Sequence, residues 1–123
     1  MLSQARPVGF ISTTDPDRAR TFYEGALGLS LEDDGFALVA QVGGGVLRIT
    51  TLPEFAASPH PAFGFMTEDL RGVAGSLAGK GVAFERYAFL GDAQDADGIW
   101  TGPNGTQLAW FKDPDGNLLT LGS

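Results

Sequence analysis

Few side chains in this sequence could carry out catalysis or hold a metal ion. His60 is the only histidine, and the chain has no cysteine, so neither a Ser-His-Asp set nor a Cys-His set is expected. His60 lies in the loop sequence SPHP, where we expect a solvated side chain rather than a metal ligand. The carboxylates of Glu54, Glu68 and Glu85 are candidates for acid–base chemistry, although we expect each to be a surface charge.

Two other stretches match known binding loops only in part. Residues 92–98, DAQDADG, lack the leading acid, the closing glutamate and the flanking helices of a calcium loop, so we expect a solvated acidic loop. The glycines at 43–45 precede an expected strand rather than a helix. They therefore indicate a hairpin turn and not a phosphate-binding loop.

Arg48 needs an anionic partner. It lies in the apolar run VLRI, residues 46–49, and a guanidinium on an apolar strand is expected to pair with a negative charge. That partner could be Glu54, Glu68 or Glu85, within the chain or across subunits, or it could be the carboxylate or oxyanion of a ligand. Because the chain is rich in acids, we favour a protein carboxylate.

The composition limits the partners and the compartment. The chain has 123 residues, 43% of them hydrophobic, and 8 basic against 15 acidic residues give a net charge of −7. This balance argues against nucleic acid and against anionic membrane surfaces as partners, and would favour cationic over anionic ligands. No signal peptide or membrane-spanning run is found, and the absence of cysteine fits a cytoplasmic protein.

The first half of the chain predicts a strand, a helix and three further strands. The strand is PVGFIST, residues 7–13. Asp15 as the N-cap and Pro16 at the first helical position start the helix, and Gly28 ends it. The three later strands, separated by glycine turns, are LSLED, FALVAQV and VLRITT.

The second half repeats this order. AFGFMT is the strand, a helix starts near Asp69, and VAFERY, GIWTG, TQLAWFKD and NLLTL follow as strands, the last after a turn at Asp113-Pro114-Asp115-Gly116. The repetition predicts an α+β fold of two βαβββ units, one at about 6–52 and one at about 61–122, in a single domain 1–123. The sheet faces away from the helices must be covered by each other, by a ligand or by a second subunit.

Two motifs in these halves, DPDRARTFYEGALGL and FKDPDGNLLTL, together resemble the vicinal oxygen chelate superfamily of glyoxalase I, bleomycin resistance proteins and extradiol dioxygenases. The resemblance implies the glyoxalase/bleomycin resistance/dioxygenase fold, with curved mixed sheets that form a cleft. It also implies a homodimer, because members of the superfamily commonly pair two chains.

Enzymes of this superfamily hold one divalent metal ion with about four side chains, usually histidine and glutamate. Counting from the motifs places these four positions at Val8, Arg48, Phe63 and Thr120. Valine and phenylalanine have no donor atom, arginine repels a cation, and threonine offers a weak neutral oxygen. We therefore expect no metal and no other cofactor.

Strand alternation from these positions predicts a cleft lined by apolar and aromatic groups, one cation and a few hydroxyls, which suits an organic ligand with a planar or apolar body. Core packing is the competing explanation for each aromatic residue. The expected ligand-binding residues are Val8, Phe10, Arg48, Thr50, Phe63, Phe65, Trp100, Trp110 and Thr120.

The favoured hypothesis is a non-catalytic protein that binds a small organic molecule, similar to the bleomycin-resistance branch, which sequesters drugs and so confers antibiotic resistance. The alternative is a metal-dependent lyase, isomerase or dioxygenase of the same superfamily with atypical ligands. A third hypothesis is an interaction module whose cleft is filled by its own side chains.

Overall fold

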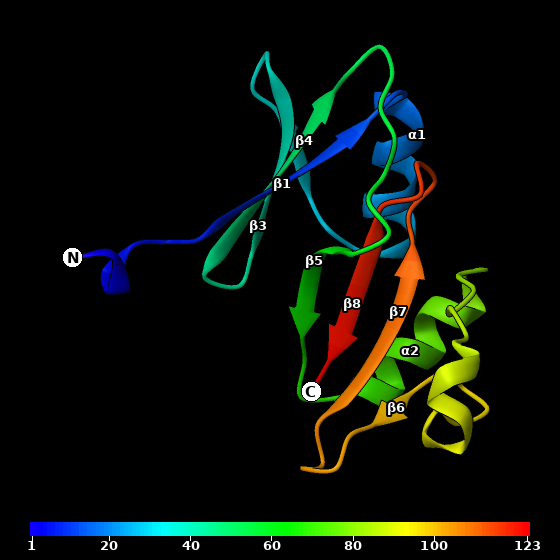
Figure 1. Ribbon diagram of the computed structural model, residues 1–123. Helices are drawn as coiled ribbons and strands as arrows, with labels where there is room; N and C mark the ends of the chain where they lie inside the picture. Colours follow the sequence, from blue (N-terminus) through cyan, green and yellow to red (C-terminus); the bar gives the residue numbers. More distant parts are fainter. The chain divides into compact units, whose positions relative to one another are not determined.

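Each half of the chain folds around its own four-stranded sheet (Figure 1). The structure is a computed structural model that describes residues 1–123, and it divides into two units, Met1–Ala57 and Ser58–Ser123. The predicted repeats, at about 6–52 and 61–122, each fall within one unit. Their union in a single domain stays a prediction.

The first unit has the predicted βαβββ order. Its sheet has the strand order β1-β4-β3-β2, with β1 parallel to β4 and the other neighbours antiparallel. The elements are η1 (Leu2–Gln4), β1 (Val8–Thr13), α1 (Pro16–Arg20), η2 (Thr21–Ala26), β2 (Leu31–Asp33), β3 (Ala37–Val42) and β4 (Gly45–Thr51).

The predicted helix start of the first unit is confirmed. The Asp15 side chain accepts a hydrogen bond from the Arg18 N–H at 3.1 Å, and Pro16 occupies the first helical turn. After Arg20 the helix widens into the π-helical segment η2, and the chain leaves it at Gly28, whose φ is 70°. A residue without a Cβ takes this left-handed conformation readily.

The two faces of the first sheet differ in burial. Ile11, Leu47 and Ile49 lie on one face and are buried, as are Ala19 and Tyr23 of the helical segment. On the other face Phe10 pairs with Arg48 in register. We call this second face, which also carries Val8 and Thr50, the open face of the first unit.

The second unit repeats this topology with the order β5-β8-β7-β6, in which β5 is parallel to β8. The α+β fold of two βαβββ units is therefore confirmed. The elements are β5 (Pro61–Met66), α2 (Leu70–Gly79), η3 (Ala88–Ala93), β6 (Trp100–Thr101), β7 (Gln107–Lys112) and β8 (Leu118–Gly122). No helix in either unit has the length and apolar character that spanning a bilayer would need.

The motifs that begin α2 and precede β8 also fold as predicted. The Asp69 side chain caps α2 by accepting the Gly72 N–H at 3.1 Å. In the turn before β8, the Gly116 N–H donates to the Asp113 carbonyl at 3.0 Å, and Gly116 has a φ of 86°. The buried Asp113 carboxylate accepts hydrogen bonds from the Asn117 backbone and side chain, which fixes the turn.

The predicted strand at 82–87 does not form. Phe84 makes only an isolated bridge to Phe111, and Glu85 N–H donates to the Trp110 carbonyl. Beyond that point a side chain takes the place of a neighbouring strand, because Gln94 bonds both the Glu85 carbonyl and the Tyr87 N–H. The predicted strand at 98–102 forms, but it is shorter and covers only β6, Trp100–Thr101.

The prediction that Phe63 and Phe65 share a face with Thr120 is wrong. Phe63 pairs with Leu119 and Phe65 with Leu121, so both lie on the face of these two leucines, whereas Thr120 lies on the opposite face. A register shift between Pro61 and Phe63 explains the error, because a slip of one residue exchanges the two faces of a strand.

The face of Leu119 and Leu121 is the helix side of the second sheet. There α2 packs against β8 and contributes the buried residues Leu70, Ala74 and Leu77. We call the opposite face, which carries Leu118, Thr120 and Trp110, the open face of the second unit.

Candidate functional site

The open face of the second unit carries an aromatic pocket with a volume of about 500 Å³. All its lining residues belong to the second unit, and none has a side chain that is charged at neutral pH. They are Pro59, Pro61, Tyr87, Phe89, Leu90, Trp100, Leu108, Trp110 and Leu118.

Strand register brings the floor of this aromatic pocket together. Trp100 of β6 lies opposite Leu108 of β7, and Trp110 of β7 lies opposite Thr120 of β8. Residues that lie opposite each other, or two apart on one strand, share a face. The sheet therefore places both tryptophans, the only two in the chain, on one side.

The aromatic rings meet at angles that form walls rather than a flat stack. The Trp100 and Trp110 ring centroids are 6.2 Å apart with the planes tilted by 39°. The Tyr87 ring lies 5.5 Å from the Trp110 ring at 75°, so these two rings make a corner. Phe89 lies 5.7 Å from Tyr87, and its side chain is 85% exposed, which places it at the mouth of the pocket.

Tyr87, Phe89 and Leu90 come from the long connection between α2 and β6, residues 80–99, and Gln94 holds this connection in place. The Gln94 side chain is buried, with 4% exposure. Its amide nitrogen donates to the Glu85 carbonyl at 2.7 Å and to the Gly98 carbonyl at 3.0 Å. Its amide oxygen accepts the Tyr87 N–H at 3.0 Å. One side chain thus ties the two ends of the loop together and fixes the backbone of Tyr87.

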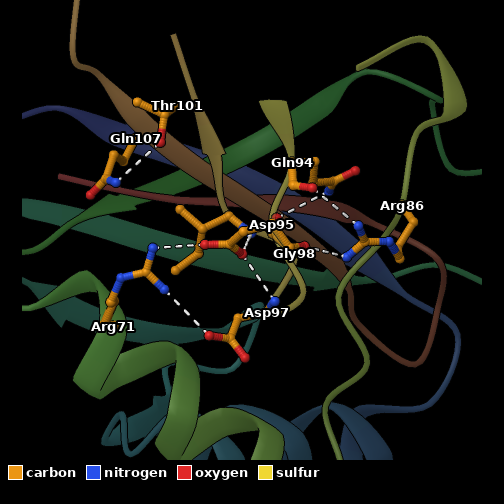
Figure 2. Close-up of polar contacts among 9 residues, drawn as sticks. Arg71, Arg86, Gln94, Asp95, Asp97, Gly98, Thr101 and Gln107 are labelled. Carbon is orange, nitrogen blue, oxygen red and sulfur yellow. Dashed lines mark hydrogen bonds and ion pairs between the residues drawn. The ribbon is translucent and has the colours of Figure 1, made fainter. Parts of the chain in front are cut away.

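Two arginines brace the same connection (Figure 2). Arg71 of α2 contacts Asp95 at 2.7 Å and Asp97 at 3.3 Å, and Arg86 donates to the Asp95 carbonyl at 2.6 Å. The hydrogen bond from Arg71 lowers the pKa of Asp95 and, in return, raises the pKa of Arg71. The segment 92–98, expected to be a solvated acidic loop, does expose Asp92 and Asp97, and its Asp95 and Asp97 are also paired with Arg71.

A smaller cavity of about 310 Å³ lies between α2 and this connection. Its charged lining residues, Arg71, Arg86 and Asp97, already bond within the brace. Arg71 and Asp97 are paired with each other there, whereas Arg86 donates only to the backbone carbonyls of Gln94 and Asp95.

The charged side chains near the aromatic pocket, Glu85 and Lys112, are not part of its lining. Glu85 pairs with Lys112 at 3.5 Å. Burial, and then the negative charge of Glu85, raises the pKa of the Tyr87 hydroxyl. Tyr87 therefore stays a neutral phenol near pH 7, and the pocket has an uncharged, electron-rich interior.

Four predicted ligand-binding residues, Val8, Phe10, Arg48 and Thr50, gather on the open face of the first unit. Val8 and Phe10 are 47% and 63% exposed. Arg48 pairs with Asp34 at 2.8 Å, so a protein carboxylate is its partner, although the predicted acids Glu54, Glu68 and Glu85 were the wrong ones.

Backbone N–H groups of the following turn hold the Asp34 carboxylate in place and keep it ionised. The carboxylate accepts N–H groups from Phe36 and Ala37 at 2.9 Å each, and these bonds, followed by Arg48, lower its pKa.

The residues that are present do not fit a divalent metal. Neither unit contains a group of three or more histidine, cysteine, aspartate or glutamate side chains that could hold an ion. Of the four positions inferred from the motifs, Phe63 turns to the helix side, and its neighbours Ala62 and Gly64 have no donor atom. Arg48, at another of these positions, carries a positive charge that would repel a metal ion, and it is paired with Asp34.

The structure thus divides the nine predicted ligand-binding residues. Trp100 and Trp110 line the aromatic pocket, and Thr120 lies beside Trp110 on the same face. Phe63 and Phe65 do not line it, and their contact with a ligand stays a prediction.

Tyr87, Phe89 and Gln94 are site residues that the sequence pattern did not identify. The apolar run YAFL at 87–90, within a loop, was the one available signal for the first two.

Comparison with known proteins agrees with this fold. A family model described as the Glyoxalase/Bleomycin resistance protein/Dioxygenase superfamily matches residues 7–121. A glyoxalase family protein from Enterococcus faecalis aligns over 100% of both chains with a TM-score of 0.76 and 20% identity. No protein with a curated function matches the sequence.

Two further solved structures are similar. A lactoylglutathione lyase from Agrobacterium tumefaciens aligns over 97% of this chain and 92% of its own, with a TM-score of 0.72 and 18% identity. A superfamily member from Sphaerobacter thermophilus DSM 20745 aligns over 99% and 98%, with a TM-score of 0.73 and 19% identity. At these identities the likeness concerns the fold.

Proposed function

This chain belongs to the glyoxalase/bleomycin resistance protein/dioxygenase superfamily, and from that premise we propose that its second unit binds an apolar or aromatic small molecule without a metal ion. The observation that carries the proposal is the aromatic pocket of about 500 Å³. Its volume is within the range of small-molecule sites, which are mostly apolar with few polar groups.

The donor chemistry of the chain supports binding rather than bond breaking. The lining of the aromatic pocket offers no nucleophile, no general base and no ligand set for a metal. Burial of an apolar ligand against two tryptophans and a tyrosine would supply the affinity. The role that follows is sequestration, as in the bleomycin-resistance branch, and a homodimer and a cytoplasmic location are part of the same proposal.

A thermal-shift screen tests this proposal. Protein treated with EDTA is mixed with a panel of neutral and cationic aromatic compounds, including bleomycin. We expect at least one compound to raise the Tm of the wild type, because a ligand that binds only the folded state stabilises it. The variant Trp110→Leu should lose that rise, while Phe36→Leu, at a side chain that is 84% exposed on the first unit, should keep it.

Two results would overturn the proposal. One is a panel in which no compound stabilises the wild type. The other is tight, stoichiometric binding of Mn, Fe, Ni or Zn, which would favour a metal-dependent enzyme with atypical ligands.

A further inference from the structure

The aromatic pocket has a composition that selects for charge as well as for shape. Four of its lining residues are aromatic, Tyr87, Phe89, Trp100 and Trp110, and none is cationic. Lys112, which lies opposite the lining residue Leu118, is paired with Glu85. An anionic ligand would find no cation in the lining, so the pocket disfavours carboxylates and phosphates.

The ring arrangement favours a cation. A ring face carries negative charge density, and cations bind over the faces of tryptophan and tyrosine within about 6 Å of the ring centre. The 75° corner between Tyr87 and Trp110, with Trp100 tilted by 39° from Trp110, lets more than one ring flank a single group. Glu85, whose charge helps to raise the pKa of the Tyr87 hydroxyl, is paired with Lys112, so the preference for a cation comes from the rings.

The scarcity of acceptors in the lining defines the kind of cation. A primary ammonium group has three N–H donors that need acceptors, and burying them without partners is unfavourable. The lining offers the Tyr87 hydroxyl as its one side-chain oxygen. A quaternary ammonium has no N–H group and a low requirement for hydration, so it fits an apolar aromatic site.

We propose that the ligand of the aromatic pocket carries a quaternary ammonium group held against Tyr87, Trp100 and Trp110. This inference rests on the proposed function, since it names the chemical class of ligand for the same site. The rings recognise the charge, and the leucine and proline side chains contact the apolar remainder of the molecule.

A matched pair of probes tests the charge alone. The cation meta-hydroxyphenyltrimethylammonium and the neutral meta-tert-butylphenol have nearly the same shape and differ in a nitrogen for a carbon. Calorimetric titration of the wild-type protein should show the cation binding about tenfold more tightly. Trp100→Leu should reduce this preference to less than about twofold, because leucine keeps an apolar surface but has no π face. Trp100→Phe keeps a ring and should retain most of the preference.

The outcomes separate the inference from the proposed function. If both probes bind equally, or the neutral one binds more tightly, the inference is overturned and the binding function stands. If Trp100→Leu keeps the full preference, the rings are not its source and the inference is overturned. If neither probe binds, the inference fails as well, and the thermal-shift panel decides the proposed function on its own.

Discussion

The two units share a topology but differ in the connection between the helix and the next strand. In the first unit the chain passes from η2 to β2 through residues 27–30, whereas in the second it passes from α2 to β6 through residues 80–99. The short connection leaves the open face of its sheet with Val8 and Phe10 exposed. The long connection places Tyr87 and Phe89 beside the tryptophans of its sheet.

The repeated strands and helices form the scaffold of both units, whereas the long connection between α2 and β6, present only in the second unit, forms the pocket with its sheet. The equivalent antiparallel pairs, β3 with β4 and β7 with β8, give each unit an open face, whereas the register shift in β5 has no counterpart in β1. Only the second unit has a buried glutamine, Gln94, that folds a loop against its sheet. The open face of the first unit carries an internal ion pair, Arg48 with Asp34.

The largest effect should come from removing the residue that fixes the long connection. Gln94→Ala leaves the carbonyls of Glu85 and Gly98 and the N–H of Tyr87 without their partner. We expect the free energy of unfolding to fall by about 4 kcal/mol, since each buried unsatisfied group costs about 1–3 kcal/mol. Urea denaturation measures this loss.

The control for Gln94 lies in the first unit. Gln41 is exposed, and its side chain accepts a hydrogen bond from the Arg6 side chain. Gln41→Ala should change the stability by less than about 0.5 kcal/mol. Equal losses for the two variants would contradict the special role of the long connection.

A glycine pair gives the next comparison. Gly98 and Gly35 have nearly the same φ, 86° and 90°, but a Cβ at Gly98 would lie 2.8 Å from Phe84 Cβ, whereas at Gly35 it would meet nothing within 4 Å. Gly98→Ala should therefore destabilise by about 3 kcal/mol and Gly35→Ala by about 1 kcal/mol. Chemical denaturation of both variants checks the difference, and similar values would mean that the loop yields at Gly98.

Ligand affinity should separate the two open faces. Trp110→Leu should weaken binding of meta-tert-butylphenol about tenfold, because it removes a wall of the aromatic pocket. Phe10→Leu, on the open face of the first unit, should weaken it less than about twofold. Calorimetric titration of both variants measures the contrast, and a larger loss for Phe10→Leu would move the site to the first unit.

The smallest effect concerns the exposed ion pairs and their dependence on pH. The pKa of Asp95 is lowered in the folded protein, mainly by Arg71. A carboxyl group with a lowered pKa contributes stability that is present above its unfolded pKa, about 4, and is lost as the pH falls through the folded value.

Arg71→Gln should therefore lower the Tm by a few degrees at most near pH 7, and by less as the pH falls below about 4. Arg48→Gln in the first unit should give a smaller change of the same sign, because the backbone N–H groups of Phe36 and Ala37, ahead of Arg48, lower the pKa of Asp34. Thermal unfolding at several pH values checks both variants. A difference in Tm between wild type and variant that grows as the pH falls would contradict the predicted pH dependence.

The sequence predicts features set by near neighbours in the chain. The helix caps at Asp15 and Asp69 and the turn at residues 113–116 formed as expected, because each depends on residues within three or four positions. The sequence places Trp100 and Trp110 on neighbouring strands without deciding which way they face, and the strand pairing puts both on one face.

Features that depend on distant partners were not predictable from the sequence. The partner of Arg48 proved to be Asp34, which reaches it through the pairing of β3 with β4. The register shift at the start of β5 moved Phe63 and Phe65 to the helix side. In the stretch 82–87, expected to be a strand, the Glu85 carbonyl and the Tyr87 N–H bond to the Gln94 side chain instead of to another strand. No local sequence pattern predicts this.

Proton–nitrogen correlation spectra of the EDTA-treated protein, titrated with meta-tert-butylphenol, test the central claim most directly. The chain has two indole N–H groups, from Trp100 and Trp110, and both side chains line the aromatic pocket. We predict that both indole signals shift saturably while the backbone signals of Phe10 and Arg48 stay in place. Indole signals that stay fixed while those of the first unit move, or shifts that require an added metal ion, would contradict a metal-free ligand site in the second unit.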